Sequence, residues 1–201
     1  MFSFITLRFG LIRSLSDEFK NYFDNDLNVV ALYSEFIKYL QVLSANSQPE
    51  HWILKSPMHG LWIQTFNKSF PDALYIMTNR DLPKAISSTS SLMLSINKIY
   101  EKNFNKNEIG EKSCGIKKIF DSIDNFKQEL KEKERWIDVN YRDLLIDPTI
   151  VIKKIYDQFG LQYTNQFEEK MKKWLQVNPQ HVSGKHTHDL KDFGLDEKNF
   201  N

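Results

Sequence analysis

The spacing of apolar and polar residues predicts a chain of helices interrupted by a few short strands. Apolar side chains recur every three or four residues in several segments, which is the period of a helix with one buried face. The predicted helices are residues 15–24, 27–44, 58–70, 83–101, 116–133, 148–159 and 164–177. Asp26 directly precedes one of them and is expected to cap it. The polar stretch 102–113 is expected to form a loop, and the tail from residue 179 has no period.

Three short apolar runs have the length and residue types of buried strands. They are HWILK (51–55), ALYIMT (73–78) and WIDVNY (136–141). Because helices alternate with these runs, the sequence predicts an α/β fold in which a parallel sheet is flanked by helices. Ligands of such sheets bind beyond the carboxyl ends of the strands. The residues at these three strand ends are therefore the first candidates for a functional site.

Composition limits the function further. The chain has 201 residues, 41% of them hydrophobic, with a formal net charge of +1. These values are typical of one soluble globular domain, and the charge offers no overall field to attract nucleic acid or an anionic membrane. Cys114 is the only cysteine, which excludes an internal disulfide and fits a reducing, cytoplasmic location. No apolar run reaches the length of a membrane span, and the start of the chain lacks a signal-peptide pattern.

The strand end at Arg80 has the features of an anion site. A helix that starts at Leu82-Pro83 follows this arginine, and its first turns carry Ser87 and Ser88. A guanidinium close to hydroxyls and amides at the start of a helix is suited to bind phosphate. The alternative is that Arg80 forms a surface ion pair with Asp81 or Asp72 and that the serines are solvated.

The residues around this site resemble those of a known family. The stretch WILKSPMHGLWIQTFNKSFPDALYIMTNRDLPKAISSTSSLM (52–93) is similar to the core of sulfotransferases that use 3′-phosphoadenosine 5′-phosphosulfate (PAPS), in which Lys-Ser-Pro-x-His, Phe-Pro-Asp-Ala and Arg-Asp-Pro occur in this order. Residues 136–161 and 184–197 resemble later segments of the bacterial-type branch. The resemblance implies the P-loop NTPase-like sulfotransferase fold, with PAPS as co-substrate and no metal.

The resemblance also implies roles for four nucleotide-binding residues. Arg80 and Ser88 match the positions that hold the 3′-phosphate, in agreement with the anion site inferred above. Tyr141 matches an aromatic position near the adenine, although a tyrosine that caps the core is an equally good interpretation. Lys185, within Gly184-Lys185-His186, resembles a late basic segment that closes over the nucleotide; the alternative is a flexible basic tail.

Sulfuryl transfer needs positive or hydrogen-bonding groups near the transferred charge and a base for the acceptor's proton. Lys55 suits the first role as a mobile ammonium. His59 is the best candidate for the base because its ordinary pKa lies near neutrality. The alternative is that His59 packs against Trp62. His181, His186 and His188 with Asp189 do not have the spacing of a zinc site, so no metal is expected.

One expected feature is missing from the sequence. The family's loop that wraps the 5′-phosphosulfate, and any other glycine-rich phosphate loop, is absent before residue 55. We therefore expect residues 1–201 to form a single sulfotransferase domain that is incomplete at its N-terminal side. Two hypotheses follow: an enzyme that transfers sulfuryl to the hydroxyl or amine of a small molecule, glycan or peptide, or a non-catalytic remnant that binds nucleotide or a partner. The missing Walker motif disfavours a kinase or GTPase.

Overall fold

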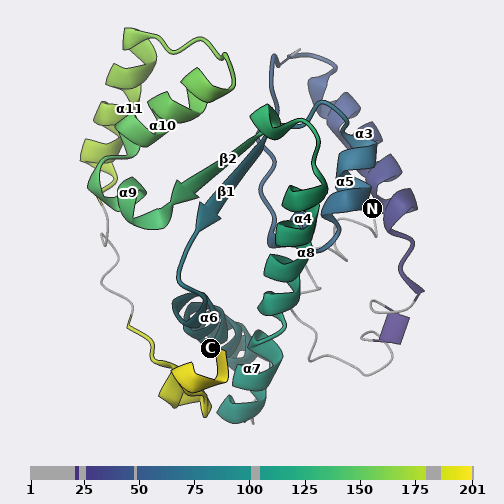
Figure 1. Ribbon diagram of the computed structural model, residues 1–201, viewed down its shortest axis with the longest axis vertical. Helices are drawn as coiled ribbons and strands as arrows, with labels where there is room; N and C mark the ends of the chain where they lie inside the picture. The colour runs from purple at the N-terminus through teal and green to yellow at the C-terminus, as the bar shows by residue number, and fades with distance from the viewer. Residues whose placement is uncertain (1–20, 23–25, 48, 101–104, 180–186, 201) are drawn as a thin grey trace.

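The computed structural model describes residues 21–22, 26–47, 49–100, 105–179 and 187–200. In these residues, helices surround a sheet of two parallel strands, β1 (Tyr75–Asn79) and β2 (Trp136–Asn140) (Figure 1). Tyr75 pairs with Trp136 at one end of the sheet and Asn79 with Asn140 at the other. The molecule therefore has the helix-rich α/β architecture that the sequence predicts, with a small sheet.

One side of the sheet carries the larger core. The helices there are α3 (Val29–Ser44), α4 (Pro57–Leu61), α5 (Ile63–Ser69) and α8 (Ile116–Glu129). Buried residues of α3, α5 and α8 form one cluster with Tyr75 of β1 and Trp136 of β2, and α4 packs against α8. The Tyr75 ring is stacked on Trp136, with 5.7 Å between ring centroids, and meets Phe126 of α8 edge-on at 5.2 Å. Aromatic contacts therefore join both strands to α8.

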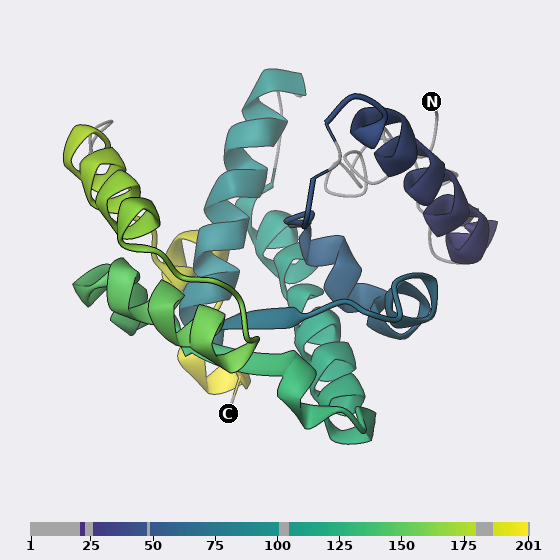
Figure 2. The same cartoon turned by 90° about the horizontal axis from the view of Figure 1, so that it is seen from above.

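The opposite side of the sheet is covered by later helices. They are α9 (Tyr141–Ile146), α10 (Pro148–Gln158) and α11 (Asn165–Val177), which lie across the strands from α3 and α5 (Figure 2). Val139 of β2 packs there with Val151 and Ile155 of α10. Asp147 caps α10 by accepting the backbone N–H groups of Thr149 and Ile150. The sheet therefore lies between the larger core and this smaller cluster.

The first two helices after β1 meet the C-terminal segment (residues 187–200) near the carboxyl end of the sheet. After β1 come α6 (Leu82–Tyr100) and α7 (Lys106–Ser113), and the 3₁₀ helix η2 (Lys133–Arg135) precedes β2. Two further 3₁₀ turns, η3 (Leu190–Phe193) and η4 (Glu197–Phe200), lie against α6, and η3 also packs on α7 (Figure 1). Leu190 and Phe193 of η3 are buried in this contact.

The strand predicted at residues 51–55 is wrong. Residues 51–56 have no regular structure, and no strand among the described residues pairs with them. The Ile53 side chain is 93% exposed, whereas Leu54 packs partly against the larger core. The Trp52 indole N–H donates to the Ser44 hydroxyl at 3.2 Å. Of the apolar residues 52–54, only Leu54 packs against the larger core, so this apolar run is not a buried strand.

Three details of the predicted helices also need correction. Residues 106–113 form α7 rather than a loop, because Asn105 caps the helix and Ile109 is buried. The predicted helix 58–70 is interrupted at Trp62, whose φ of −115° and ψ of 32° separate α4 from α5. Asn28, not Asp26, caps α3, by accepting from the Ala31 N–H at 3.0 Å. Most of the helix predicted at 15–24 lies outside the described residues.

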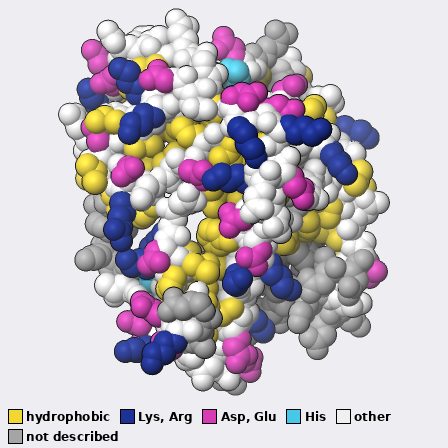
Figure 3. Space-filling view, in the orientation of Figure 1, with side chains coloured by type: hydrophobic (Ala, Val, Ile, Leu, Met, Phe, Trp, Pro, Cys, Tyr) yellow, Lys and Arg dark blue, Asp and Glu magenta, His cyan; other side chains and the backbone are white. Residues whose placement is uncertain are grey.

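None of the helices in the described residues is both long enough and apolar enough to cross a membrane. Charged side chains of both signs are interspersed on the face seen in Figure 3, around an area of apolar side chains near its middle. This distribution agrees with the net charge of +1.

Candidate nucleotide and transfer site

Arg80 and Tyr141 meet at the carboxyl end of the sheet. Each directly follows a strand, and the pairing of Asn79 with Asn140 places the two strand ends side by side. The guanidinium carbon of Arg80 lies 5.0 Å from the centroid of the Tyr141 ring, within the range of a cation–π contact. The structure thus brings together two of the residues that the sequence singles out.

Arg80 does not form the surface ion pair considered as an alternative. In the described part of the chain, Asp81 faces Lys84 instead, with 3.8 Å between the carboxylate and the ammonium. The Arg80 side chain is exposed, and α6 begins two residues later at Leu82. The arginine is therefore oriented by the Tyr141 ring while its N–H groups face solvent at a strand end, where an anion can reach them.

The serines of α6 differ in their surroundings. Ser88 is half-buried, whereas Ser87 is buried and pairs with the C-terminal segment. The Ser87 hydroxyl lies 2.9 Å from Nδ1 of His188 and 3.2 Å from the Lys84 carbonyl. A hollow of about 480 Å³ opens beside this pair, between the start of α6 and the C-terminal segment. Sequence reasoning missed the contact because 101 residues separate Ser87 from His188.

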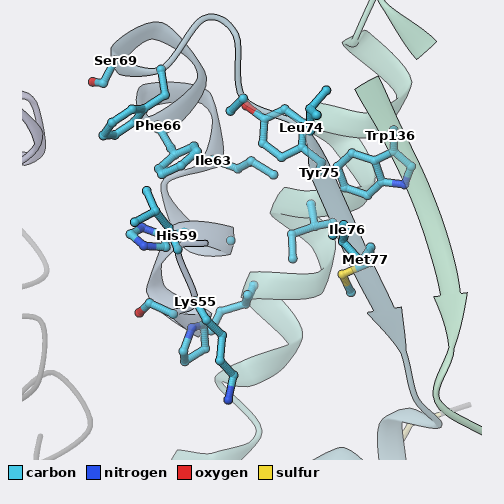
Figure 4. A pocket seen from close by; sticks show the side chains of 18 of the residues that line it. Lys55, His59, Ile63, Phe66, Ser69, Leu74, Tyr75, Ile76, Met77 and Trp136 are labelled. Carbon is cyan, nitrogen blue, oxygen red and sulfur yellow. The ribbon is translucent and has the colours of Figure 1, made fainter. Parts of the chain in front are cut away.

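Lys55 and His59 line a second, larger hollow of about 810 Å³. It lies between β1, α4, α5 and α8, and its other lining residues are mainly apolar (Figure 4). Ser56 caps α4 by accepting from the Met58 N–H at 3.3 Å, and Pro57 occupies the first turn. Lys55 therefore stands just before a helix and is exposed. Figure 4 shows its side chain extending past α4 in the direction in which β1 runs.

His59 is held by aromatic neighbours from two helices. Its ring centroid lies 4.8 Å from that of Phe66, 6.1 Å from that of Phe36 and 5.9 Å from that of Tyr33. The Tyr33 hydroxyl lies 3.0 Å from His59 Nδ1. Burial lowers the pKa of His59 below its usual value, because charge is disfavoured among these rings. His59 is therefore neutral at pH 7.

The predicted convergence of three strand ends is only partly correct. The ends at Arg80 and Tyr141 are adjacent, but residues 51–55 do not form a strand. Lys55 and His59 line the large hollow instead, and neither Arg80 nor Ser88 is part of its lining. Lys185, with His181 and His186, lies outside the described residues. Within the described residues, no three His, Cys, Asp or Glu side chains are grouped to hold a metal ion.

Comparison with known proteins identifies the family. The model of the sulfotransferase family matches residues 10–165, which is most of the chain. The chain belongs to the sulfotransferase family. The matched region contains Lys55, His59, Arg80, Ser88 and Tyr141. It ends before the segment that carries His188.

Solved sulfotransferases have the same fold. The sulfotransferase STF9 of Mycobacterium avium is 25% identical, with a TM-score of 0.81 over 92% of this chain and 47% of its own. STF1 of Mycobacterium tuberculosis is 23% identical, with a TM-score of 0.64 over 78% of this chain and 40% of its own. This chain therefore spans less than half the length of either structure. No curated protein matches the sequence.

Proposed function

We propose that the chain, as a single sulfotransferase domain over residues 1–201, transfers a sulfuryl group from PAPS to the hydroxyl or amine of a small-molecule, glycan or peptide acceptor. Family membership supports the reaction class. The observation that carries the proposal is the position of Arg80 against Tyr141 at two adjacent strand ends. A fixed guanidinium next to an aromatic ring suits a ligand with both a phosphate and a base.

In this proposal, the nucleotide is bound through its 3′ side. Arg80 and Ser88 hold the 3′-phosphate, and Tyr141 lies near the adenine. Lys185 supplies a further positive charge. Arg80 is suited to its role because no carboxylate of the described residues neutralises it. A guanidinium binds phosphate through two parallel N–H donors, which gives geometric specificity as well as affinity.

The transfer step is assigned to the large hollow. The S–O bond between the sulfuryl group and the 5′-phosphate breaks while a bond to the acceptor oxygen or nitrogen forms, and the acceptor loses a proton. Lys55 stabilises the negative charge on the transferred group and the leaving phosphate. His59 lies beside the reacting groups, where it can receive the acceptor's proton or donate a hydrogen bond. The tautomer of His59 determines whether the ring nitrogen that faces these groups accepts the proton or donates the hydrogen bond. The contact with Tyr33 controls this tautomer.

A second candidate function is a nucleotide-binding or interaction module without transferase activity. The absence of a glycine-rich phosphate loop from residues 1–54 motivates it. Sulfate transfer from PAPS by the purified 201-residue chain, measured over a panel of phenols, alcohols and amines, would exclude this second function.

The nucleotide site is tested by calorimetric titration with 3′-phosphoadenosine 5′-phosphate. Adenosine 5′-phosphate is the matched ligand control, because it lacks only the 3′-phosphate. We expect binding that requires the 3′-phosphate, and a loss of about tenfold or more in affinity for Arg80→Ala, since a hydrogen bond to a charged group contributes about 1.5–3 kcal/mol. Arg142→Ala removes the neighbouring exposed arginine as a control. Equal affinity of wild type and Arg80→Ala would show that the phosphate binds elsewhere.

A further inference from the structure

Tyr33 and His59 form an isolated polar contact inside an aromatic cluster. Tyr33 lies on α3 and has 0% of its surface exposed. Its hydroxyl is 3.0 Å from His59 Nδ1, and its ring meets Phe66 and Phe70 edge-on at 5.5 and 6.3 Å. In the described part of the chain, His59 is the only hydrogen-bond partner of this hydroxyl. The bond therefore lies between two groups that have apolar surroundings.

The surroundings decide which of the two groups donates. If Nδ1 carried the hydrogen and donated it, the phenolic hydrogen of Tyr33 would face aromatic rings without an acceptor. A buried donor without a partner costs about 1–3 kcal/mol. If Tyr33 donates instead, both its hydrogen and the Nδ1 lone pair are satisfied. Burial raises the pKa of Tyr33 well above its usual value, so the phenol keeps its hydrogen throughout the working pH range.

We infer that Tyr33 donates to Nδ1 and thereby holds neutral His59 in the tautomer that carries its hydrogen on Nε2. Tyr33 is then a positioning residue, and His59 is a hydrogen-bond donor rather than a base. A neutral imidazole has one N–H and one lone pair, and here the lone pair on Nδ1 is already occupied by the Tyr33 hydroxyl.

This inference rests on the proposed function and deepens it. Nε2–H of His59 donates to an oxygen of the sulfuryl group during transfer and stabilises its charge. The S–O bond to the 5′-phosphate breaks, the bond to the acceptor oxygen or nitrogen forms, and the acceptor's proton passes to solvent. The base predicted from the sequence is therefore replaced by an electrostatic role that His59 shares with Lys55, which lines the same hollow.

The tautomer can be measured without any enzymatic activity. Long-range ¹H–¹⁵N NMR spectra of the full chain with ¹⁵N-labelled histidine distinguish protonated from unprotonated ring nitrogens, and the signals that disappear in His59→Gln assign His59. We expect a protonated Nε2 and an unprotonated, hydrogen-bonded Nδ1 at neutral pH. In Tyr33→Phe, the Nδ1 signal should move to the position of a nitrogen without a donor. A hydrogen on Nδ1 in the wild type would overturn the inference.

Two substitutions at His59 separate donor from base in the transfer reaction. The amide N–H of His59→Gln can donate from nearly the same place as Nε2–H but cannot act as a base, whereas His59→Leu can do neither. Loss of one such donor costs about a hundredfold in rate or more, so we expect that loss for leucine and less than a tenfold loss for glutamine. Equal losses in both variants would contradict the donor role. If no variant and no wild type transfers sulfate, the proposed function fails, while the NMR spectrum still decides the tautomer.

Discussion

The guanidinium carbon of Arg80 lies 5.0 Å from the ring centroid of Tyr141, although 61 positions separate the two residues in the sequence. The parallel register of the sheet produces this contact, because Asn79 pairs with Asn140 and each candidate residue follows its own strand. Tyr141 is also the first residue of α9, which fixes its backbone. The aromatic ring limits the positions that the exposed arginine can adopt, and a phosphate site benefits from such orientation.

Replacing Tyr141 therefore tests whether this ring contributes to nucleotide binding. In Tyr141→Leu, Arg80 loses a cation–π contact of about 0.5–1 kcal/mol, and any stacking of the adenine is lost too. We expect the affinity for 3′-phosphoadenosine 5′-phosphate to fall by about threefold or more. Tyr141→Phe keeps the ring and should bind like the wild type in the same calorimetric titration. If the leucine variant binds equally well, Tyr141 has no part in the site.

The aromatic cluster between β1, β2 and α8 should dominate stability. Phe126 is 4% exposed and contacts both Tyr75 and Trp136. Truncation of such a buried ring costs about 3–5 kcal/mol, so Phe126→Ala should lower the free energy of unfolding by that amount in urea denaturation. Trp174 of α11 is 61% exposed, so Trp174→Ala should change the free energy of unfolding by less than about 0.5 kcal/mol. Similar losses in both variants would mean that this cluster does not carry the stability.

The packing of the C-terminal segment depends on Gly110. A Cβ atom added there would lie 2.3 Å from the backbone carbonyl oxygen of Phe193, so η3 would have to move away from α7. Gly110→Ala should therefore increase hydrogen exchange in residues 187–200 while β1 and β2 stay protected. Gly115→Ala is the matched control, because the nearest atom to its added Cβ is 3.1 Å away, within its own turn. Unchanged exchange in Gly110→Ala would show that the segment tolerates the substitution.

The sequence is informative where structure depends on local pattern. The predicted runs 73–78 and 136–141 overlap β1 and β2, because short stretches of apolar and β-branched residues between turn residues have the pattern of strands. The same reasoning failed at residues 51–55, since an apolar run becomes a strand only where another strand can pair with it. It also failed for α7, whose polar residues hide a small buried face at Ile109 and Gly110 that depends on the distant η3.

In the candidate site, too, some contacts could be predicted from the sequence and others could not. Arg80 and Tyr141 could be predicted to lie together because the carboxyl ends of parallel strands share one edge of the sheet. The contact between Tyr33 and His59 could not, because a buried tyrosine in a helix has the same pattern as any other core residue. Tyr33 of α3 reaches Nδ1 of His59 in α4 because α3 packs on α5, which directly follows α4 and also contacts it. Hydrogen bonds between distant elements depend on tertiary packing, which periodicity does not describe.

Asp147 should make stability depend on pH in the acid range. Its carboxylate accepts hydrogen bonds from the Thr149 hydroxyl at 2.6 Å and from the backbone N–H groups of Thr149 and Ile150 at 2.9 and 3.2 Å. The bond from the Thr149 hydroxyl is the main reason that the pKa of Asp147 lies below its usual value of 3.8, and the two backbone bonds add to the effect. The folded state thus holds the ionised form, and α10 depends on it for its N-cap.

The sign of the pH effect follows from this pKa. Since the unfolded chain takes up the proton first as pH falls, the stabilisation is complete above the unfolded pKa and is lost as pH falls through the folded pKa. Asp147→Asn keeps a good N-cap without the charge. We expect the wild type to be the more stable at neutral pH and its advantage to vanish under acid conditions, as measured by urea denaturation across the acid range. Asp124→Asn, at an exposed position of α8, controls for the loss of one negative charge. A constant difference between wild type and Asp147→Asn at every pH would mean that ionisation of Asp147 does not stabilise α10.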